Sequence, residues 1–253
     1  MPNHVTTIFT LEGLSGDALA KAQAVFLDDK RLVDFNMLMP MPDCLRGFEP
    51  HSGITTRAEL ALGLVKEPVQ GATDLSAITA NLGVSNAMRA ATTPVRADDI
   101  PLIARALSNY AECGFLYWYD WCNENWGTKW GAYGQSHAWP EDATEFEFQT
   151  AWSHPWAIMK LLSERVGDVR ISVRYADEDT GSNCGKYTLL AGEVSDEDIA
   201  PRNSEMTDAE KSKWVEFAFK LTHPNDDPRE YGYNENWVYD EEIAEAFEAA
   251  RSA

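Results

Sequence analysis

The chain has 253 residues, of which 44% are apolar and 25% charged, an ordinary globular composition that can fill a folded core and argues against intrinsic disorder. Its 41 acidic and 21 basic residues give a formal net charge of −20, which disfavours direct binding to nucleic acid or to anionic membranes. Because no run approaches the roughly 18 consecutive apolar residues of a membrane-spanning helix, we expect a soluble protein.

A strand and a helix are predicted at the start of the chain. Residues 4–12 alternate in the way expected of a strand and are rich in β-branched side chains. Residues 16–29 then place Leu19, Ala22 and Phe26 on one side of an amphipathic helix. We therefore expect a strand followed by a helix that packs on the sheet.

A helical insertion is predicted at about residues 36–127. Pro40 and Pro42 exclude a continuing helix near its beginning, so this part is expected to be an extended connector. The apolar spacing then becomes helical, and residues 98–114 have the pattern of a complete helix that ends at Gly114.

The second half of the chain is predicted to contain strands and a helix in alternation. Residues 128–136 and 145–152 are expected to form a β-hairpin, because turn-forming residues separate two alternating segments. Residues 155–166 have a helical apolar stripe. Strands are expected at residues 169–176 and again at residues 185–194.

These elements predict an α+β fold. Without the insertion their order is the βαββαβ order of a ferredoxin-like core, with both helices on one face of the sheet. We therefore expect a ferredoxin-like domain at residues 1–192 and an acidic, helical C-terminal extension at residues 193–253. The last 61 residues contain 17 acidic and 6 basic residues, so they carry 11 of the 20 excess negative charges.

The acidic composition allows three interpretations. The ordinary one is a solvated surface that keeps the protein in solution. The second is a patterned acidic face that imitates the phosphates of DNA toward a DNA-binding partner. The third is a surface that binds divalent cations.

Aromatic side chains are concentrated at residues 116–134, which hold four of the nine tryptophans and three of the nine tyrosines. The helical spacing of the tryptophans and the stop at Gly127 predict a short helix. Consecutive side chains project about 100° apart around a helix, so the rings cannot all face the core. We expect most ring area to be buried and the remainder to line a surface groove. The predicted groove residues are Trp118, Asp120, Trp121, Glu124, Asn125, Trp126, Lys129 and Trp130.

Asp120 and Glu124 are also the candidates for catalytic chemistry. Four residues apart on a helix, they are close enough for a general acid and base or for a metal site, with His137 or His154 as a further member. Exposed carboxylates beside Lys129 are more commonly solvated or paired. The sequence has no metal-binding histidine motif, phosphate loop or nucleophile motif, so we predict no catalytic residue, metal or cofactor.

The four cysteines show no CxxC spacing, and the N-terminal residues lack the basic and apolar segments of a signal peptide. This pattern predicts free thiols in a reducing cytoplasm and gives no iron–sulfur site. The cysteines are Cys44, Cys113, Cys122 and Cys184.

Four segments carry a family resemblance: "MPNHV", "FN" followed by "MPMP", "WYDWCNENWGTKWGAY" and "FQTAWS". Over about residues 1–192 the chain resembles the YubB-type family of bacteriophage and plasmid proteins with a ferredoxin-like domain. It departs from the pattern of that family at Gly131, where asparagine is usual, and at His154, where proline is usual. The resemblance implies a mobile genetic element and the cytoplasm of a bacterial host, and it implies no established reaction.

Two classes of function follow from these observations. The first is a stoichiometric inhibitor, of the anti-defence and DNA-mimic type, that binds a basic DNA- or RNA-binding host protein. The alternative is a small hydrolase or transferase with a site around the tryptophan-rich helix. We expect binding without turnover, and no direct contact with nucleic acid or a membrane.

Overall fold

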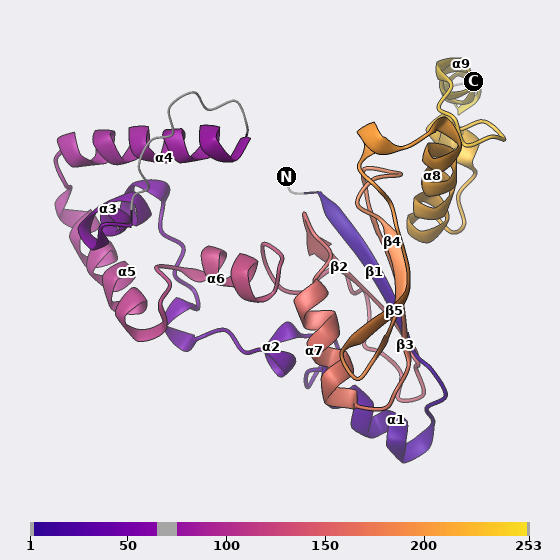
Figure 1. Cartoon of the computed structure of the whole chain (residues 1–253), viewed down its shortest axis with the longest axis horizontal. Coiled ribbons are helices and arrows are strands. Elements are labelled where there is room, and N and C mark those ends of the chain that lie inside the picture. The colour runs from indigo at the N-terminus through magenta and orange to yellow at the C-terminus, as the bar shows by residue number, and fades with distance from the viewer. Residues whose placement is uncertain (1–2, 65–74, 252–253) are drawn as a thin grey trace. The chain divides into compact units, whose positions relative to one another are not determined.

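The computed structural model describes the backbone of residues 3–64 and 75–251, and the side chains of residues 3–64, 84–247 and 249–250. The chain has a mixed α+β fold and divides into two compact units (Figure 1). Unit 1 comprises Met1–Pro40 and Cys122–Ala253, and unit 2 comprises Met41–Trp121. No helix among the described residues is long and apolar enough to cross a membrane.

Unit 1 is built on a five-stranded sheet in which every neighbouring pair is antiparallel. The strand order is β2-β1-β3-β4-β5, so β1 lies between β2 and β3 although it comes first in the chain. In register, Val5 lies opposite Thr150 of β2 and Asp177 of β3. The strands are β1 (His4–Leu11), β2 (Glu145–Ala151), β3 (Ile171–Asp177), β4 (Gly185–Leu190) and β5 (Glu193–Ile199).

Two helices, α1 (Gly16–Gln23) and α7 (Trp156–Val166), pack on one face of the sheet. The alternation of β1 directs Phe9 to this face, where its ring stacks on Phe146 and meets Phe26 edge to face. The helix α7 buries Ile158, Met159 and Leu162 at helical spacing. A short helix, α2 (Phe35–Leu38), packs beside α7.

The helix α8 (Asp208–Thr222) covers part of the opposite face, and Figure 1 shows α7 and α8 on the two sides of the sheet. Thr207 and Glu210 form a capping box that satisfies backbone donors at its start. Trp214 is fully buried in the cluster beneath α8. The helix α9 (Glu241–Arg251) follows and packs beside η4 (Pro228–Tyr231); η3 (Asn203–Glu205) precedes α8.

Unit 2 is helical, with η1 (Asp43–Leu45), α3 (Ser52–Leu62), α4 (Leu75–Thr92), η2 (Ala97–Asp99) and α5 (Ile100–Cys113). Its core is separate from that of unit 1 and contains Phe48, Ile54, Ala58, Ala106 and Leu116. The left-handed Gly114 ends α5, as the sequence predicts. The helix α6 (Trp118–Asn125) spans the boundary between the two units.

Three of the strands predicted for one sheet, at residues 4–12, 145–152 and 169–176, are confirmed, and so is the packing of two helices on one face. The first helix is shorter than predicted, because α1 ends at Gln23 rather than near residue 29. The strand predicted at residues 128–136 is wrong. Only Tyr133 pairs with Gln149, as an isolated bridge at the β2 edge. The left-handed Gly134 follows at once and interrupts the extended backbone that a longer ladder needs.

The C-terminal extension is not wholly helical, because residues 193–199 form β5 and pair with β4. Acidic side chains make this segment look solvent-exposed in the sequence, and most of them are indeed exposed in the strand. Val194 and Ile199 are the apolar residues of β5, and both are half-buried. The domain boundary at residue 192 stays a prediction.

Candidate functional site

The tryptophan-rich segment forms the predicted short helix, α6, but the boundary between the units falls between Trp121 and Cys122. Trp118, Asp120 and Trp121 of the predicted groove therefore belong to unit 2. Trp121 is 6% exposed and Trp118 is half-buried, whereas Asp120 is exposed. The rings of Tyr117 and Tyr119 stack with centroids 5.9 Å apart, and Trp118 meets both edge to face.

Trp126 belongs to the core of unit 1. Its side chain is 2% exposed, and its Nε1 donates a hydrogen bond to the backbone oxygen of Met39 at 3.0 Å. Its ring meets Phe35 edge to face at 5.7 Å. The indole is thus held by packing and by a satisfied donor, as buried tryptophans require.

A surface aromatic pair surrounds Lys129. The Lys129 Nζ lies 4.7 Å from the ring centroid of Trp130 and 4.6 Å from that of Trp152, distances suited to cation–π attraction. Trp130 is half-buried, and Trp152 is 42% exposed. The sequence does not predict Trp152 as a partner of Lys129, because the two residues are far apart in the chain. Trp152 follows directly after β2, and the folded structure brings its ring to Lys129. In the same unit Glu124 is exposed and Asn125 is half-buried.

The histidines proposed as partners for Asp120 and Glu124 have other roles. His154 is 3% exposed, and its Nδ1 and Nε2 lie 2.9 Å from Thr7 Oγ1 and 2.7 Å from the Tyr187 hydroxyl. Burial lowers the pKa of His154 to about 3, so its imidazole is neutral. His137 makes a contact with Ser136. The described residues contain no group of three metal-binding side chains.

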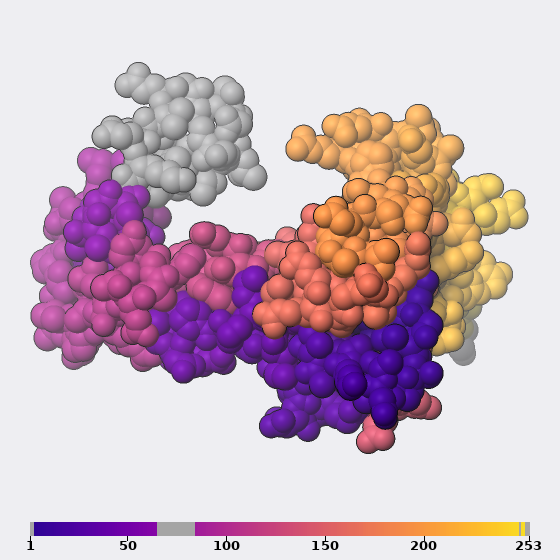
Figure 2. Space-filling view, turned by 60° about the horizontal axis from the view of Figure 1, so that its bottom comes forward, coloured from indigo at the N-terminus to yellow at the C-terminus, as the bar shows by residue number. Residues whose placement is uncertain are grey.

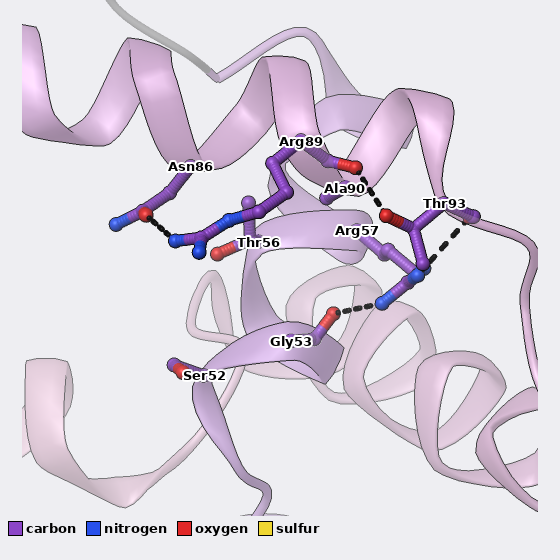
Figure 3. Close-up of a pocket in the computed structure, with 8 residues that line it drawn as sticks. All are labelled: Ser52, Gly53, Thr56, Arg57, Asn86, Arg89, Ala90 and Thr93. Atoms are coloured by element: carbon purple, nitrogen blue, oxygen red, sulfur yellow. Dashed lines mark hydrogen bonds between the residues drawn. The ribbon is translucent and has the colours of Figure 1, made fainter.

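Unit 2 contains a cavity of about 230 Å³ between α3 and α4 (Figure 3). The cavity is lined by residues that lie on one side of α3 and on one side of α4. Figure 3 shows the side chain of Arg57 extending from α3 toward α4. Arg57 Nη1 donates to Gly53 O at 3.1 Å, and Nη2 donates to Thr93 O at 3.2 Å. The lining residues are Ser52, Gly53, Thr56, Arg57, Asn86, Arg89, Ala90 and Thr93.

A second cavity, of about 400 Å³, shares Arg57 and Thr93 with the first. Here Arg96 Nη2 lies 2.9 Å from Asp99 Oδ1, and His51 Nε2 lies 3.6 Å from the same oxygen. The hydrogen bond from Arg96 lowers the pKa of Asp99, so this carboxylate is ionised at neutral pH and compensates the arginine. Sequence reasoning missed both cavities, since no local motif brings α3 and α4 together.

The acidic C-terminal segment contributes a surface of unit 1, orange to yellow in Figure 2. Residues 193–245 contain sixteen carboxylates, of which five form ion pairs with described lysine or arginine side chains. The other eleven have no ion pair among the described residues, and all but the half-buried Asp240 are exposed. This surface therefore retains a large excess of negative charge.

Comparison with known proteins gives one match. Residues 125–218 match the family model described as the ferredoxin-like domain in Api92-like protein. The matched segment includes β2, α7, β3, β4 and β5 and most of α8, whereas β1 lies outside it. No curated protein and no solved structure matches the chain. Residues 125–218 are therefore similar to the ferredoxin-like domain of Api92-like protein, in agreement with the α+β architecture of unit 1.

Proposed function

We propose that this is a phage- or plasmid-borne binding protein that inhibits a basic DNA- or RNA-binding host factor in one-to-one complexes. One observation carries the proposal: eleven carboxylates of residues 193–245 have no ion pair among the described residues. A protein surface that retains so much negative charge attracts a positively charged nucleic-acid-binding surface. The YubB-type resemblance supports a mobile element and the cytoplasm of a bacterial host.

The mechanism is electrostatic competition. The carboxylates of β5, α8 and α9 occupy the positive surface that otherwise contacts phosphates, so nucleic acid cannot bind at the same time. Charge attraction speeds the encounter of the two proteins and weakens when salt shortens the Debye length, from about 10 Å at 0.1 M to about 3 Å at 1 M. Because many charges share the attraction, affinity falls gradually as they are neutralised.

A capture and titration experiment tests the proposal. The immobilised protein is exposed to nuclease-treated bacterial lysate, a salt-eluted factor is purified, and binding of that factor to labelled DNA or RNA is titrated with the protein. We expect inhibition that saturates near one-to-one and is relieved by salt. A small hydrolase or transferase, the alternative function, would instead act at a small fraction of the factor concentration.

Two variants that each lose four negative charges distinguish an effect of the local acidic surface on binding from an effect of the net charge of the protein. In the first, four exposed carboxylates of the surface become amides: Glu193→Gln, Glu197→Gln, Glu241→Gln and Glu242→Gln. In the control, four exposed carboxylates elsewhere are neutralised: Asp29→Asn, Glu49→Gln, Glu141→Gln and Asp142→Asn. The first variant should bind the factor at least about tenfold more weakly than the control, because it loses close charge pairs. Equal loss in both variants, or inhibition that salt does not relieve, contradicts the proposal.

A further inference from the structure

The cavity between α3 and α4 contains two arginines whose charge no described carboxylate compensates. Arg57 binds the backbone oxygens of Gly53 and Thr93, and Arg89 Nη2 donates to Asn86 Oδ1 at 2.7 Å. These acceptors are neutral, so they hold the guanidinium groups without cancelling their charge. Arg96 of the neighbouring cavity differs, because Asp99 pairs with it.

Several hydrogen-bond donors of this cavity also lack an acceptor among the described residues. Arg57 Nε is buried and has no partner among the described residues, an arrangement that costs free energy when it is left unsatisfied. The hydroxyls of Ser52 and Thr56, which line the same cavity from α3, make no hydrogen bond to a described residue. Within the described part of unit 2, uncompensated positive charge and donors without an acceptor therefore lie in one cavity.

We propose that this cavity binds the phosphoryl group of a small ligand, either inorganic phosphate or a phosphomonoester. Guanidinium groups match the geometry of phosphate oxygens. The guanidinium groups come from α3 and α4, and both hydroxyls come from α3. Together they offer more donors than the two oxygens of a carboxylate accept, whereas a phosphoryl group presents three terminal oxygens. The location of Ser52 and Gly53 in the first turn of α3 adds favourable backbone dipoles.

Cavity size and charge favour a small ligand over a nucleic acid. The volume of about 230 Å³ lies below the roughly 300–1,000 Å³ of sites for drug-sized molecules, and the second cavity beside it gives room for the rest of an ester. Unit 2 contains 9 acidic and 6 basic residues, a net charge of −3, so unit 1 carries the remaining −17. A chain with this charge repels a polyanion, whereas a single phosphoryl group needs only a local positive site.

Isothermal titration calorimetry on the full chain tests this site with inorganic phosphate, AMP and a short single-stranded DNA without terminal phosphate. Ionic strength is held constant with potassium chloride. Saturable binding of phosphate or AMP supports the proposal. Equal affinities identify free phosphate as the sufficient ligand, and tighter binding of AMP identifies a phosphomonoester. Absence of saturable binding by both, or tighter binding of the DNA, overturns it.

Matched variants assign the binding to this cavity. Arg89 is exposed, so Arg89→Gln should keep the fold and weaken binding by about tenfold to a hundredfold, the range for one hydrogen bond to a charged group. Thr56→Val keeps the shape of the side chain and should weaken binding severalfold. Arg46→Gln makes the same charge change in unit 2 outside the cavity and should leave the affinity within about twofold. Equal weakening by Arg46→Gln and Arg89→Gln would refute the cavity as the site, with circular dichroism confirming that each variant is folded.

Discussion

His154 shows how a single residue couples the fold of unit 1 to pH. Its ring stacks on Tyr175 at 4.2 Å, and both ring nitrogens have hydroxyl partners. A neutral imidazole has one donor and one acceptor, and each hydroxyl can take either role, so both nitrogens are satisfied. A proton added to the buried ring would place a charge away from water, and this burial lowers the pKa of His154.

We predict that His154 makes the protein less stable as pH falls. The unfolded imidazole has a pKa of about 6.5, whereas the folded pKa is about 3. Between these values the unfolded chain binds the proton and the folded chain does not, so stability falls as pH decreases from about 6.5 toward 3. At pH 5 the loss is roughly 2 kcal/mol. Urea unfolding of the wild type and His154→Gln at pH 7 and pH 5 measures it. The variant should lose less stability than the wild type, and equal losses would contradict the prediction.

Trp126 gives a second prediction at the residue scale. Trp126→Ala should lower the free energy of unfolding by about 3–5 kcal/mol, because it removes a large buried ring. Trp126→Phe keeps most of the packing but leaves the oxygen of Met39 without its donor, and should cost about 1–3 kcal/mol. Trp130→Ala, at a half-buried site in the same unit, is the comparison and should cost less than Trp126→Ala. Urea unfolding monitored by circular dichroism gives the order, and equal costs for Trp126→Ala and Trp130→Ala would show that Trp126 is not a core residue.

At the scale of elements, the sequence predicts the helices and strands whose side chains follow a local periodic pattern. The alternation of residues 4–11 and the apolar stripe of α7 are local patterns, and both elements form as predicted. Pairing between distant segments is not visible in such patterns. Tyr133 therefore makes a single bridge where a strand is expected, and acidic residues 193–199 form an edge strand against β4. Charged side chains on an edge strand also oppose pairing with other chains.

In the candidate sites, too, local features can be predicted from the sequence, whereas contacts between distant segments cannot. The short helix α6 and the burial of Trp121 and Trp126 are predicted from spacing and aromatic content. Arg57 and Arg89 are not, because they lie on separate helices and only the packing of α3 on α4 places them in one cavity. Each arginine alone looks like an ordinary solvated residue of a helix.

A cysteine of η1 and a cysteine of α5 lie side by side, which leads us to predict that they can form a disulfide. Cys44 Sγ and Cys113 Sγ are 3.6 Å apart, and both side chains are half-buried. Burial and the neighbouring thiol raise the pKa of Cys44 to about 11, so little thiolate is present at neutral pH. With diamide as oxidant, we expect a Cys44–Cys113 disulfide to form, with two protons and two electrons passing to diamide, slowly at pH 7 and faster at pH 9.

The closed loop of this disulfide spans about 70 residues, so it should stabilise unit 2 by about 4 kcal/mol in the chain-entropy model. Mass spectrometry of a non-reduced digest identifies the linkage, and urea unfolding with and without reductant measures the stabilisation. Cys113→Ser, which removes one thiol, is the control. The prediction fails if diamide links neither cysteine to the other, or if the linked protein is no more stable than the reduced one.

At the scale of the whole molecule, charge divides unequally between the two units. Unit 1 carries a formal charge of −17 and unit 2 carries −3, although each has its own apolar core. Like charges on one compact unit repel one another and destabilise its folded state. The burial of apolar side chains must therefore offset more charge repulsion in unit 1 than in unit 2. When no partner is bound, the acidic surface that we propose for binding lowers the stability of folded unit 1 through this repulsion.

Salt should accordingly protect unit 1 more than unit 2. Raising potassium chloride from about 0.01 M to about 0.5 M shortens the Debye length from about 30 Å to a few ångströms and screens the repulsion among exposed carboxylates. Hydrogen exchange of backbone amides reports both units in one sample, with each rate divided by the intrinsic rate at the same salt concentration. We expect the slowest amides of β1 and β3 to exchange roughly tenfold more slowly at high salt, about 1.4 kcal/mol, and those of α5 to change by less than half that free energy. If protection in α5 rises as much as in the sheet, the effect of salt is general and self-repulsion in unit 1 does not limit its stability.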